Sequence, residues 1–268
     1  MNLIGLQTLA RREVKRTFLI LNQVVWPPVI STLLYFFIFV IGFGRAVGRM
    51  EGLPYVQFLV PGLIFMNVVE ASFGEAAASL FLMRFSSSIQ EILVAPLSYP
   101  EMVLGMLSGS TMRALVIGNL ILLVSWPFGG PLPHSWPWYL ALIVVVSVLF
   151  SSLGLVMALW AESFDQLSIA STFFITPMVF LGGVFTAAGA AYRQLPAAFR
   201  SVVFYNPMLY LVDGFRTAIT GHSNPFSIQI AGLLLPMWTL DLVVATLGAT
   251  LAFLLAMVLF SRGFKLRT

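Results

Sequence analysis

The chain is poor in the residues that usually build catalytic and metal sites: it has no cysteine and only two lysines and two histidines. Without cysteine, disulfides and thiolate metal sites are excluded. The histidines, His134 and His222, lack a second imidazole at ligand spacing, so we expect no metal site. The lysines, Lys15 and Lys265, do not follow a glycine, so the chain has no G-x-x-x-x-G-K-[ST] motif for binding ATP.

Charged residues are scarce as well. They make up 9% of the chain, against about 25% in an ordinary soluble domain, so we expect the chain to lie in a bilayer. The net charge of +4 is small and concentrated near the two ends, which argues against nucleic acid as a partner. No G-x-S-x-G or H-E-x-x-H motif occurs. This disfavours a membrane enzyme and leaves only an intramembrane carboxylate catalyst open.

Long apolar runs are present instead, and six of them reach the length of about 20 residues that crosses a bilayer. They cover Leu19–Gly44, Gln57–Met83, Glu101–Phe128, Trp138–Ala161, Leu167–Ala188 and Pro236–Phe260. Basic residues precede the first run and follow the last, so the positive-inside rule places both termini in the cytoplasm and requires an even number of spans. The first run is longer than the apolar part of a signal peptide, and we expect it to be retained.

The sequence therefore predicts an all-α polytopic membrane protein with a single transmembrane domain over residues 1–268. Residues 19–260 form its six-helix bundle, and residues 261–268 are a cytoplasmic tail. We find no repeat of fixed period and no soluble domain.

The first 17 residues predict an amphipathic helix. One helical face carries the apolar side chains Leu3, Leu6, Ala10 and Val14. The other carries the basic side chains Arg11, Arg12, Lys15 and Arg16. Such a helix is expected to lie in the cytoplasmic interface of the membrane.

The segment at residues 189–235, before the last span, is apolar but interrupted. Its breakers are Pro196, Asn206-Pro207, Gly221 and Asn224-Pro225. The pieces between them hold about 8 to 14 residues, which is too short to cross the membrane. We expect re-entrant helices on the outer side that pack on the spans, because backbone at membrane depth needs protein or water to satisfy it.

A short polar segment separates the second and third spans. Ser88 and Glu91 have the spacing of a capping box, which predicts the start of a helix. Pro96 ends this helix after about two turns, so it cannot span the bilayer. Ser98 and Glu101 repeat the capping-box spacing at the start of the third span. Such a rigid cytoplasmic helix suits contact with another protein, although a capped loop helix resting on lipid is an equal alternative.

Charges inside the spans are costly, and they are usually paired or functional. Glu70 and Glu75 lie in the second span and Arg113 lies in the third. Coupling to protons through Glu70 is one hypothesis. A structural pair between Arg113 and either glutamate is the one we favour. Asp213 and Arg216, three residues apart on a predicted re-entrant helix, are expected to form a local ion pair.

Two stretches in this arrangement point to a known family: QEILVAPLSYPEMVLG (Gln90–Gly105) and YNPMLYLVDGFRTAI (Tyr205–Ile219). With them, the chain resembles the membrane subunit of bacterial type-2 ATP-binding-cassette exporters over essentially its whole length. The resemblance implies a short coupling helix that docks on a separate P-loop ATPase, which would bind ATP and Mg. It also implies two permease copies, expected to be a homodimer, in the bacterial inner membrane.

The resemblance assigns expected roles to two groups of residues. Contact with the ATPase is expected at Ile89, Gln90, Glu91, Ile92, Leu93 and Glu162. The transport path and its gate are expected at Asn67, Glu70, Phe180, Gly182, Gly183, Phe185, Asn206 and Pro207. ATPase closure would push the coupling helices and tilt spans two and five, which would open the path outward.

The sequence leaves the cargo open. An amphiphilic compound, a lipid-linked glycan or a polysaccharide would each suit a path with few fixed charges. A proton-coupled secondary transporter that uses Glu70 or Glu75 is the alternative function. It would work without a second gene product, whereas an exporter of this kind needs its ATPase.

Overall fold

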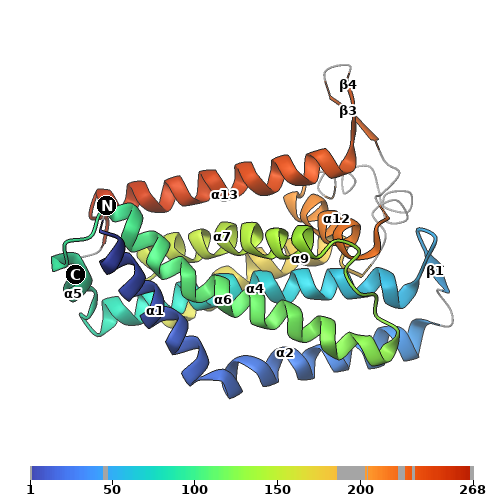
Figure 1. The fold of residues 1–268 in the computed structure, drawn as a ribbon, viewed down its shortest axis with the longest axis horizontal. Coiled ribbons are helices and arrows are strands. Elements are labelled where there is room, and N and C mark those ends of the chain that lie inside the picture. The colour runs from blue at the N-terminus through green and yellow to red at the C-terminus, as the bar shows by residue number, and fades with distance from the viewer. Residues whose placement is uncertain are drawn as a thin grey trace.

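The computed structural model describes residues 2–44, 48–185, 203, 205–222, 227–230 and 233–265, and helices dominate these residues (Figure 1). In chain order the helices are α1 (Leu3–Leu19), α2 (Leu21–Tyr35) with η1 (Phe36–Phe43), α4 (Tyr55–Phe85), α5 (Ile89–Val94), α6 (Tyr99–Ser125) with η2 (Trp126–Phe128), α7 (Trp136–Trp160), α8 (Phe164–Ala170) with η3 (Ser171–Ile175) and α9 (Thr176–Leu181), α12 (Pro207–Thr220) and α13 (Met237–Ser261). Two antiparallel hairpins join β1 (Arg49–Met50) to β2 (Leu53–Pro54) and β3 (Ser227–Ile230) to β4 (Leu233–Pro236).

Six helical segments are long and apolar enough to cross a membrane, which confirms the all-α polytopic fold. They are Leu21–Gly42, Tyr55–Phe85, Tyr99–Phe128, Trp136–Trp160, Phe164–Leu181 and Leu240–Ser261. The predicted end of the fifth span at Ala188 is wrong, because its helix stops at Leu181. Gly183 has φ of +83°, which a right-handed helix cannot include.

The bundle has one central helix, α4, and outer helices of which little surface is buried by the rest of the chain. In α4, 78% of the membrane window is buried, against 17% in α2 and 17% in the α8–α9 segment. The helices α6 and α7 pack on α4. Gly154 of α7 makes the closest approach, since a Cβ built there would lie 2.5 Å from the carbonyl oxygen of Phe73. Small residues allow such close backbone contact in membrane helices.

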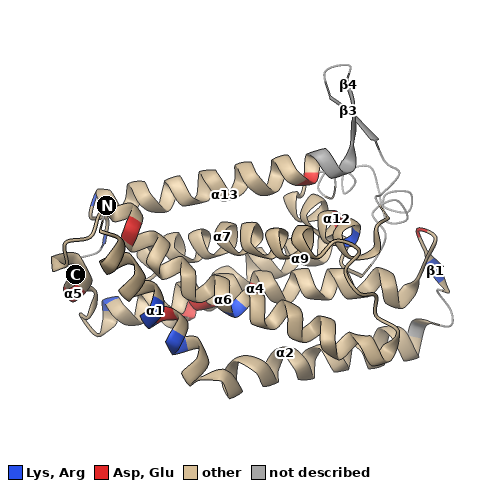
Figure 2. Ribbon diagram, viewed as in Figure 1, with Lys and Arg blue, Asp and Glu red and all other residues tan. Residues whose placement is uncertain are grey.

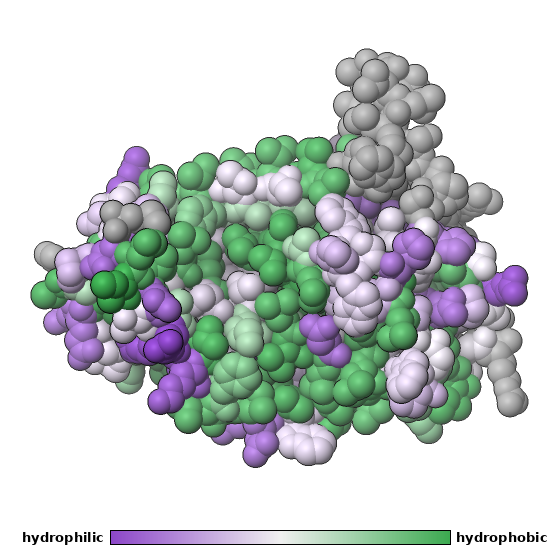
Figure 3. Space-filling view, in the orientation of Figure 1, coloured by the Kyte–Doolittle hydropathy of each residue, from purple (hydrophilic) through white to green (hydrophobic). Residues whose placement is uncertain are grey.

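The two ends of the bundle differ. The helices α1 and α5 and the end of α13 lie at one end, which we call the terminal end, and α12 and the hairpin of β1 and β2 lie at the opposite end (Figure 1). Charged residues gather at these ends and on α4 and α6 near α1 (Figure 2). Between the ends, the visible face is predominantly apolar (Figure 3). This pattern fits a membrane slab across the middle of the bundle.

The helix α1 forms as predicted, but it packs more deeply than an amphipathic helix that rests on a membrane surface. Its residues Leu9, Glu13 and Thr17 are buried. They lie against α6, where a Cβ at Gly105 would be 2.5 Å from Leu9 and a Cβ at Gly109 would be 2.9 Å from Glu13. The side chains Arg11, Arg12 and Lys15 are exposed as expected.

In the segment before the last span, the described residues include one of the expected re-entrant helices, α12 (Pro207–Thr220). The helix α12 is largely buried in the bundle, with Asn206 as its N-cap and Gly221, at φ of +73°, as its C-cap. A re-entrant helix was expected up to residue 235, but residues 227–230 and 233–236 pair as the strands β3 and β4. The breakers Pro196 and Asn224-Pro225 lie outside the described residues.

Candidate functional site: the terminal end and the path

The predicted coupling helix is α5, but its start differs from the prediction. The predicted capping box of Ser88 and Glu91 does not form. The Ser88 side chain makes no capping hydrogen bond, and the backbone of Ser88 is helical, with φ of −69° and ψ of −14°. The turn before the helix is made by Ser87, which has φ of +59°. The capping box of α6 is confirmed, and its Glu101 accepts from the Ser98 N–H at 2.7 Å.

The helix α5 packs an apolar side on the bundle and leaves its polar side exposed. Ile89 and Ile92 were expected to contact the ATPase, but they are 2% and 5% exposed and anchor α5 to the bundle. Leu93 is half-buried. Gln90 and Glu91 are exposed, as is Val94 on the last turn. The surface offered by α5 is therefore Gln90, Glu91 and Val94, which we call the α5 face.

Hydrogen bonds join α5, the start of α6 and the start of α1 into one unit. The Asn2 backbone N–H donates to Oε1 of Glu101 at 2.6 Å, and Nδ2 of Asn2 donates to the carbonyl of Pro96 at 3.2 Å. A cleft of about 610 Å³ lies between α1 and α5, with Arg12 and Glu91 among its lining residues. A force applied at this cleft would reach α1 and α6 together.

The link between α7 and α8 lies beside the C-terminal tail. Its Glu162 is exposed and pairs with Nζ of Lys265 at 2.7 Å. The hydrogen bond and charge of Lys265 lower the pKa of the Glu162 carboxyl. Arg84, at the end of α4, donates to the carbonyls of Ala158 and Ala161 at the end of α7. These contacts tie the α4 and α7 ends together beside the expected second ATPase contact.

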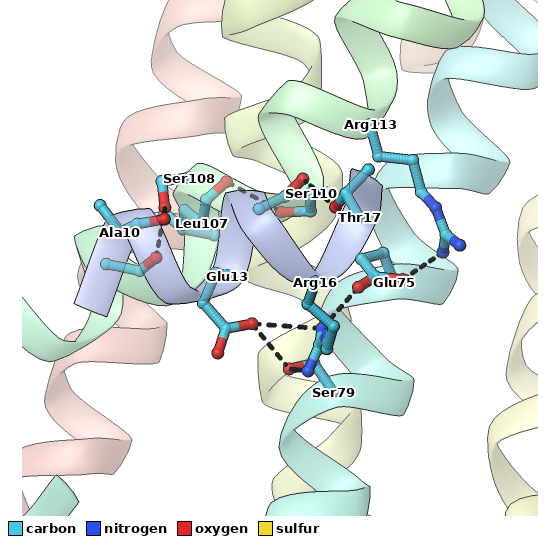
Figure 4. Close-up of polar contacts among 12 residues, drawn as sticks. Ala10, Glu13, Arg16, Thr17, Glu75, Ser79, Leu107, Ser108, Ser110 and Arg113 are labelled. Carbon is cyan, nitrogen blue, oxygen red and sulfur yellow. Dashed lines mark hydrogen bonds and ion pairs between the residues drawn. The ribbon is translucent and has the colours of Figure 1, made fainter. Parts of the chain in front are cut away.

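A partly buried ion network connects α1 with the spans (Figure 4). Glu75 of α4 pairs with Arg113 of α6, as favoured from the sequence, and its other oxygen lies 2.5 Å from Nη2 of Arg16. Arg16 was expected on the exposed basic face of α1, but it turns inward and also pairs with Glu13 at 3.2 Å. The sequence reasoning missed Glu13, although its spacing of three residues from Arg16 is a signal for a pair.

Two expected path residues, Asn67 and Glu70, lie together on α4. Asn67 is buried, and its Nδ2 donates to the carbonyl of Leu63 at 2.9 Å. Glu70 is exposed on the bundle. Both line a cavity of about 190 Å³ between α2, α4 and α6, which we call the α2–α4–α6 cavity. The other expected path residues do not line this cavity; they lie where α9 meets α12.

The contact between α9 and α12 is close. A Cβ at Gly182 would lie 2.6 Å from Cβ of Met208. Asn206 accepts from the Met208 N–H at 3.0 Å and donates to the carbonyl of Met178 at 2.6 Å, and Pro207 is the first residue of α12. One side chain thus caps α12 and fastens it to α9.

The two phenylalanines of the expected gate have different surroundings. Phe185 is buried and its ring contacts Tyr35 and Phe39 of the first span, as well as Phe180, with centroids 5.4, 4.6 and 5.1 Å away. Phe180 keeps 42% of its surface exposed. Phe185 therefore packs within the chain, and Phe180 is the one that faces outward.

Arg216 of α12 is buried at the same end. It donates to the carbonyl of Gly183, and its guanidinium lies 3.7 Å from the ring centroid of Phe58. These contacts hold α12 against α4 and the end of the fifth span. The expected pair between Arg216 and Asp213, which is also buried, stays a prediction.

Comparison with known proteins agrees with this arrangement. A family model described as ABC-2 type transporter matches residues 5–220. The chain is 35% identical over 231 residues to the inner membrane transport permease YadH of Escherichia coli K12, which covers 86% of this chain and 89% of that protein. It is 30% identical over 183 residues to nodulation protein J of Sinorhizobium fredii, with 66% and 67% covered. The chain therefore belongs to the ABC-2 type transporter family, as a multi-pass inner membrane permease subunit.

Proposed function

We propose that this permease exports an amphiphilic compound, a lipid-linked glycan or a polysaccharide from the cytoplasm, driven by a separate P-loop ATPase. ATP and Mg are bound by that ATPase. The observation that carries the proposal is the α5 face beside the cleft of about 610 Å³, built on a unit that includes α1 and α6. Movement of the docked ATPase would be transmitted to the bundle through this unit, because packed helices move as rigid elements.

We expect Glu91→Lys and Val94→Asp each to reduce recovery of the ATPase in pull-downs and to lower transport by a similar factor. Both residues are exposed on the α5 face, so the chain should still insert and fold. Co-purification from membranes that contain both subunits measures the effect. The matched control is Glu51→Lys, the same charge reversal in an exposed turn at the opposite end. Normal recovery and transport in both α5 variants would contradict docking here.

Both termini and the terminal end are proposed to be cytoplasmic. The cysteine-free chain allows a direct test with an impermeant thiol reagent on intact cells, since Ser87 and His222 are exposed at the two ends. We expect His222→Cys to be labelled and Ser87→Cys to be labelled only after the cells are permeabilised. The reverse pattern would invert the orientation. Tyr192, also expected outside, lies outside the described residues.

The functional unit is proposed to contain two permease copies. The two least covered membrane windows are α2 and the α8–α9 segment, and Phe173 and Phe174 of η3 are about 70% exposed. A second copy would cover part of this surface, and lipid the rest. A proton-coupled secondary transporter is less well supported. One of its two candidate carboxylates, Glu75, is already held by two arginines.

A further inference from the structure

The α2–α4–α6 cavity contains a carboxylate, Glu70, that makes no hydrogen bond or ion pair with the described residues. Glu70 lies fifteen residues from each end of α4 (Tyr55–Phe85), at the middle of the membrane span. Asn67, Glu75 and Arg113 line the same cavity. A charged group at this depth is costly unless something neutralises it.

The neighbouring ion network cannot supply the missing charge, because it is already balanced. It contains two positive groups, Arg16 and Arg113, and two negative groups, Glu13 and Glu75. Glu70 adds one negative charge to this neutral set. The cavity therefore carries one negative charge in excess.

The opposite wall of the cavity adds hydrogen-bond acceptors. Gln23 and Val24 of α2 line it, and the residues four positions later are Pro27 and Pro28. Proline has no N–H, so the carbonyl oxygens of Gln23 and Val24 cannot receive the usual helical hydrogen bond. Two residues that line the cavity thus have backbone carbonyls that no proline N–H can satisfy.

We infer that the α2–α4–α6 cavity binds the ammonium group of a cationic amphiphile, with Glu70 as its counter-ion and the carbonyls of Gln23 and Val24 as further acceptors. An ammonium carries one positive charge and up to three N–H donors, which matches this set. The apolar part of the ligand would extend between the helices toward lipid. This inference rests on the proposed export of an amphiphile and narrows its class.

The test uses the full-length chain in phosphatidylcholine nanodiscs, without ATPase or ATP. The probes are fluorescent dansylcadaverine, which carries a primary ammonium, and its neutral N-acetyl derivative. We expect the chain to bind the ammonium probe about tenfold more tightly than the neutral one. Glu70→Gln should reduce this ratio to about one, and Glu51→Gln, in the exposed turn at the opposite end, should leave it unchanged.

A second variant tests the location without changing charge. A Cβ at Gly74, which lines the cavity, meets no atom within 4 Å, so Gly74→Leu should fill the space and weaken binding of both probes. Equal binding of both probes to the unmodified chain, an unchanged preference in Glu70→Gln, or unchanged binding in Gly74→Leu would each overturn the inference. If the chain shows no preference for the ammonium probe but still recovers the ATPase in pull-downs, the proposed function stands without this inference. If the chain keeps the preference but does not recover the ATPase, only the proposed coupling to the ATPase is overturned.

Discussion

Replacing Glu75 by leucine is expected to lower the free energy of unfolding by about 3–5 kcal/mol, the cost of leaving buried charge without its partner. Glu75 holds both Arg16 and Arg113 in a site where its own side chain is 7% exposed. Its loss leaves Arg16 with Glu13 alone and takes from Arg113 the carboxylate with which it pairs. Unfolding in mixed micelles with increasing dodecyl sulfate measures the change.

Two comparison variants make this result interpretable. Glu162→Leu removes a carboxylate from an exposed pair with Lys265, so it should lower the free energy of unfolding far less, because exposed ion pairs contribute little to stability. The double variant Glu75→Leu/Arg113→Leu restores the charge balance, because the pair of Arg16 and Glu13 remains, and it should recover more than half of the loss. A loss in Glu75→Leu no larger than that in Glu162→Leu would show that the network is not coupled. The same conclusion would follow if the loss in the double variant equalled the sum of the losses in Glu75→Leu and Arg113→Leu.

Replacing Gly182 and Gly183 together by leucine is expected to reduce export by at least about tenfold while leaving ATPase recovery intact. The new Cβ at Gly182 would overlap Met208 of α12, and Gly183 has φ of +83°, a conformation that leucine rarely adopts. The variant thus forces apart α9 and α12, where the gate is proposed, and leaves the distant α5 face untouched. Transport of cargo into inverted vesicles measures the loss.

The control is Gly42→Leu, the same change at an exposed position of the first span, where an added Cβ would lie 3.9 Å from its nearest neighbour. It should export normally.

Crosslinks between copies test the geometry separately. The side chains of Val179 and Val184 are buried within the chain, whereas Leu181 is 45% exposed. We expect a crosslink at Leu181→Cys and none at Val179→Cys. Normal export by the double leucine variant would remove the gate from this contact.

The sequence was sufficient to locate the six membrane spans, because the length of an apolar run indicates whether a helix can cross the bilayer. It failed where a single backbone conformation decides the outcome. The apolar run of the fifth span continues past Leu181, but the left-handed Gly183 ends the helix. Ser88 has the right spacing to cap α5, yet the positive φ of Ser87 completes the turn one residue earlier and leaves Ser88 helical. An N-cap usually needs extended backbone.

The candidate sites were predicted less well, because their geometry depends on partners far away in the chain. A helical wheel places Arg16 with the other basic residues of α1, but Glu75, 59 residues later, draws it inward. The buried face of α1 was also missed. Its signal is the G-x-x-x-G spacing of Gly105 and Gly109 in α6, which leaves a groove for α1.

The central helix α4 and its two covering helices, α6 and α7, are consecutive membrane spans within residues 55–160, with only the short α5 between α4 and α6. During synthesis these three helices emerge one after another, before the α8–α9 segment and α13 exist. The core can therefore assemble beside the ribosome from neighbouring segments, with no wait for the C-terminal third. The later helices then join a finished support. Substitutions on the lipid-facing sides of these later helices should therefore alter few contacts with the core.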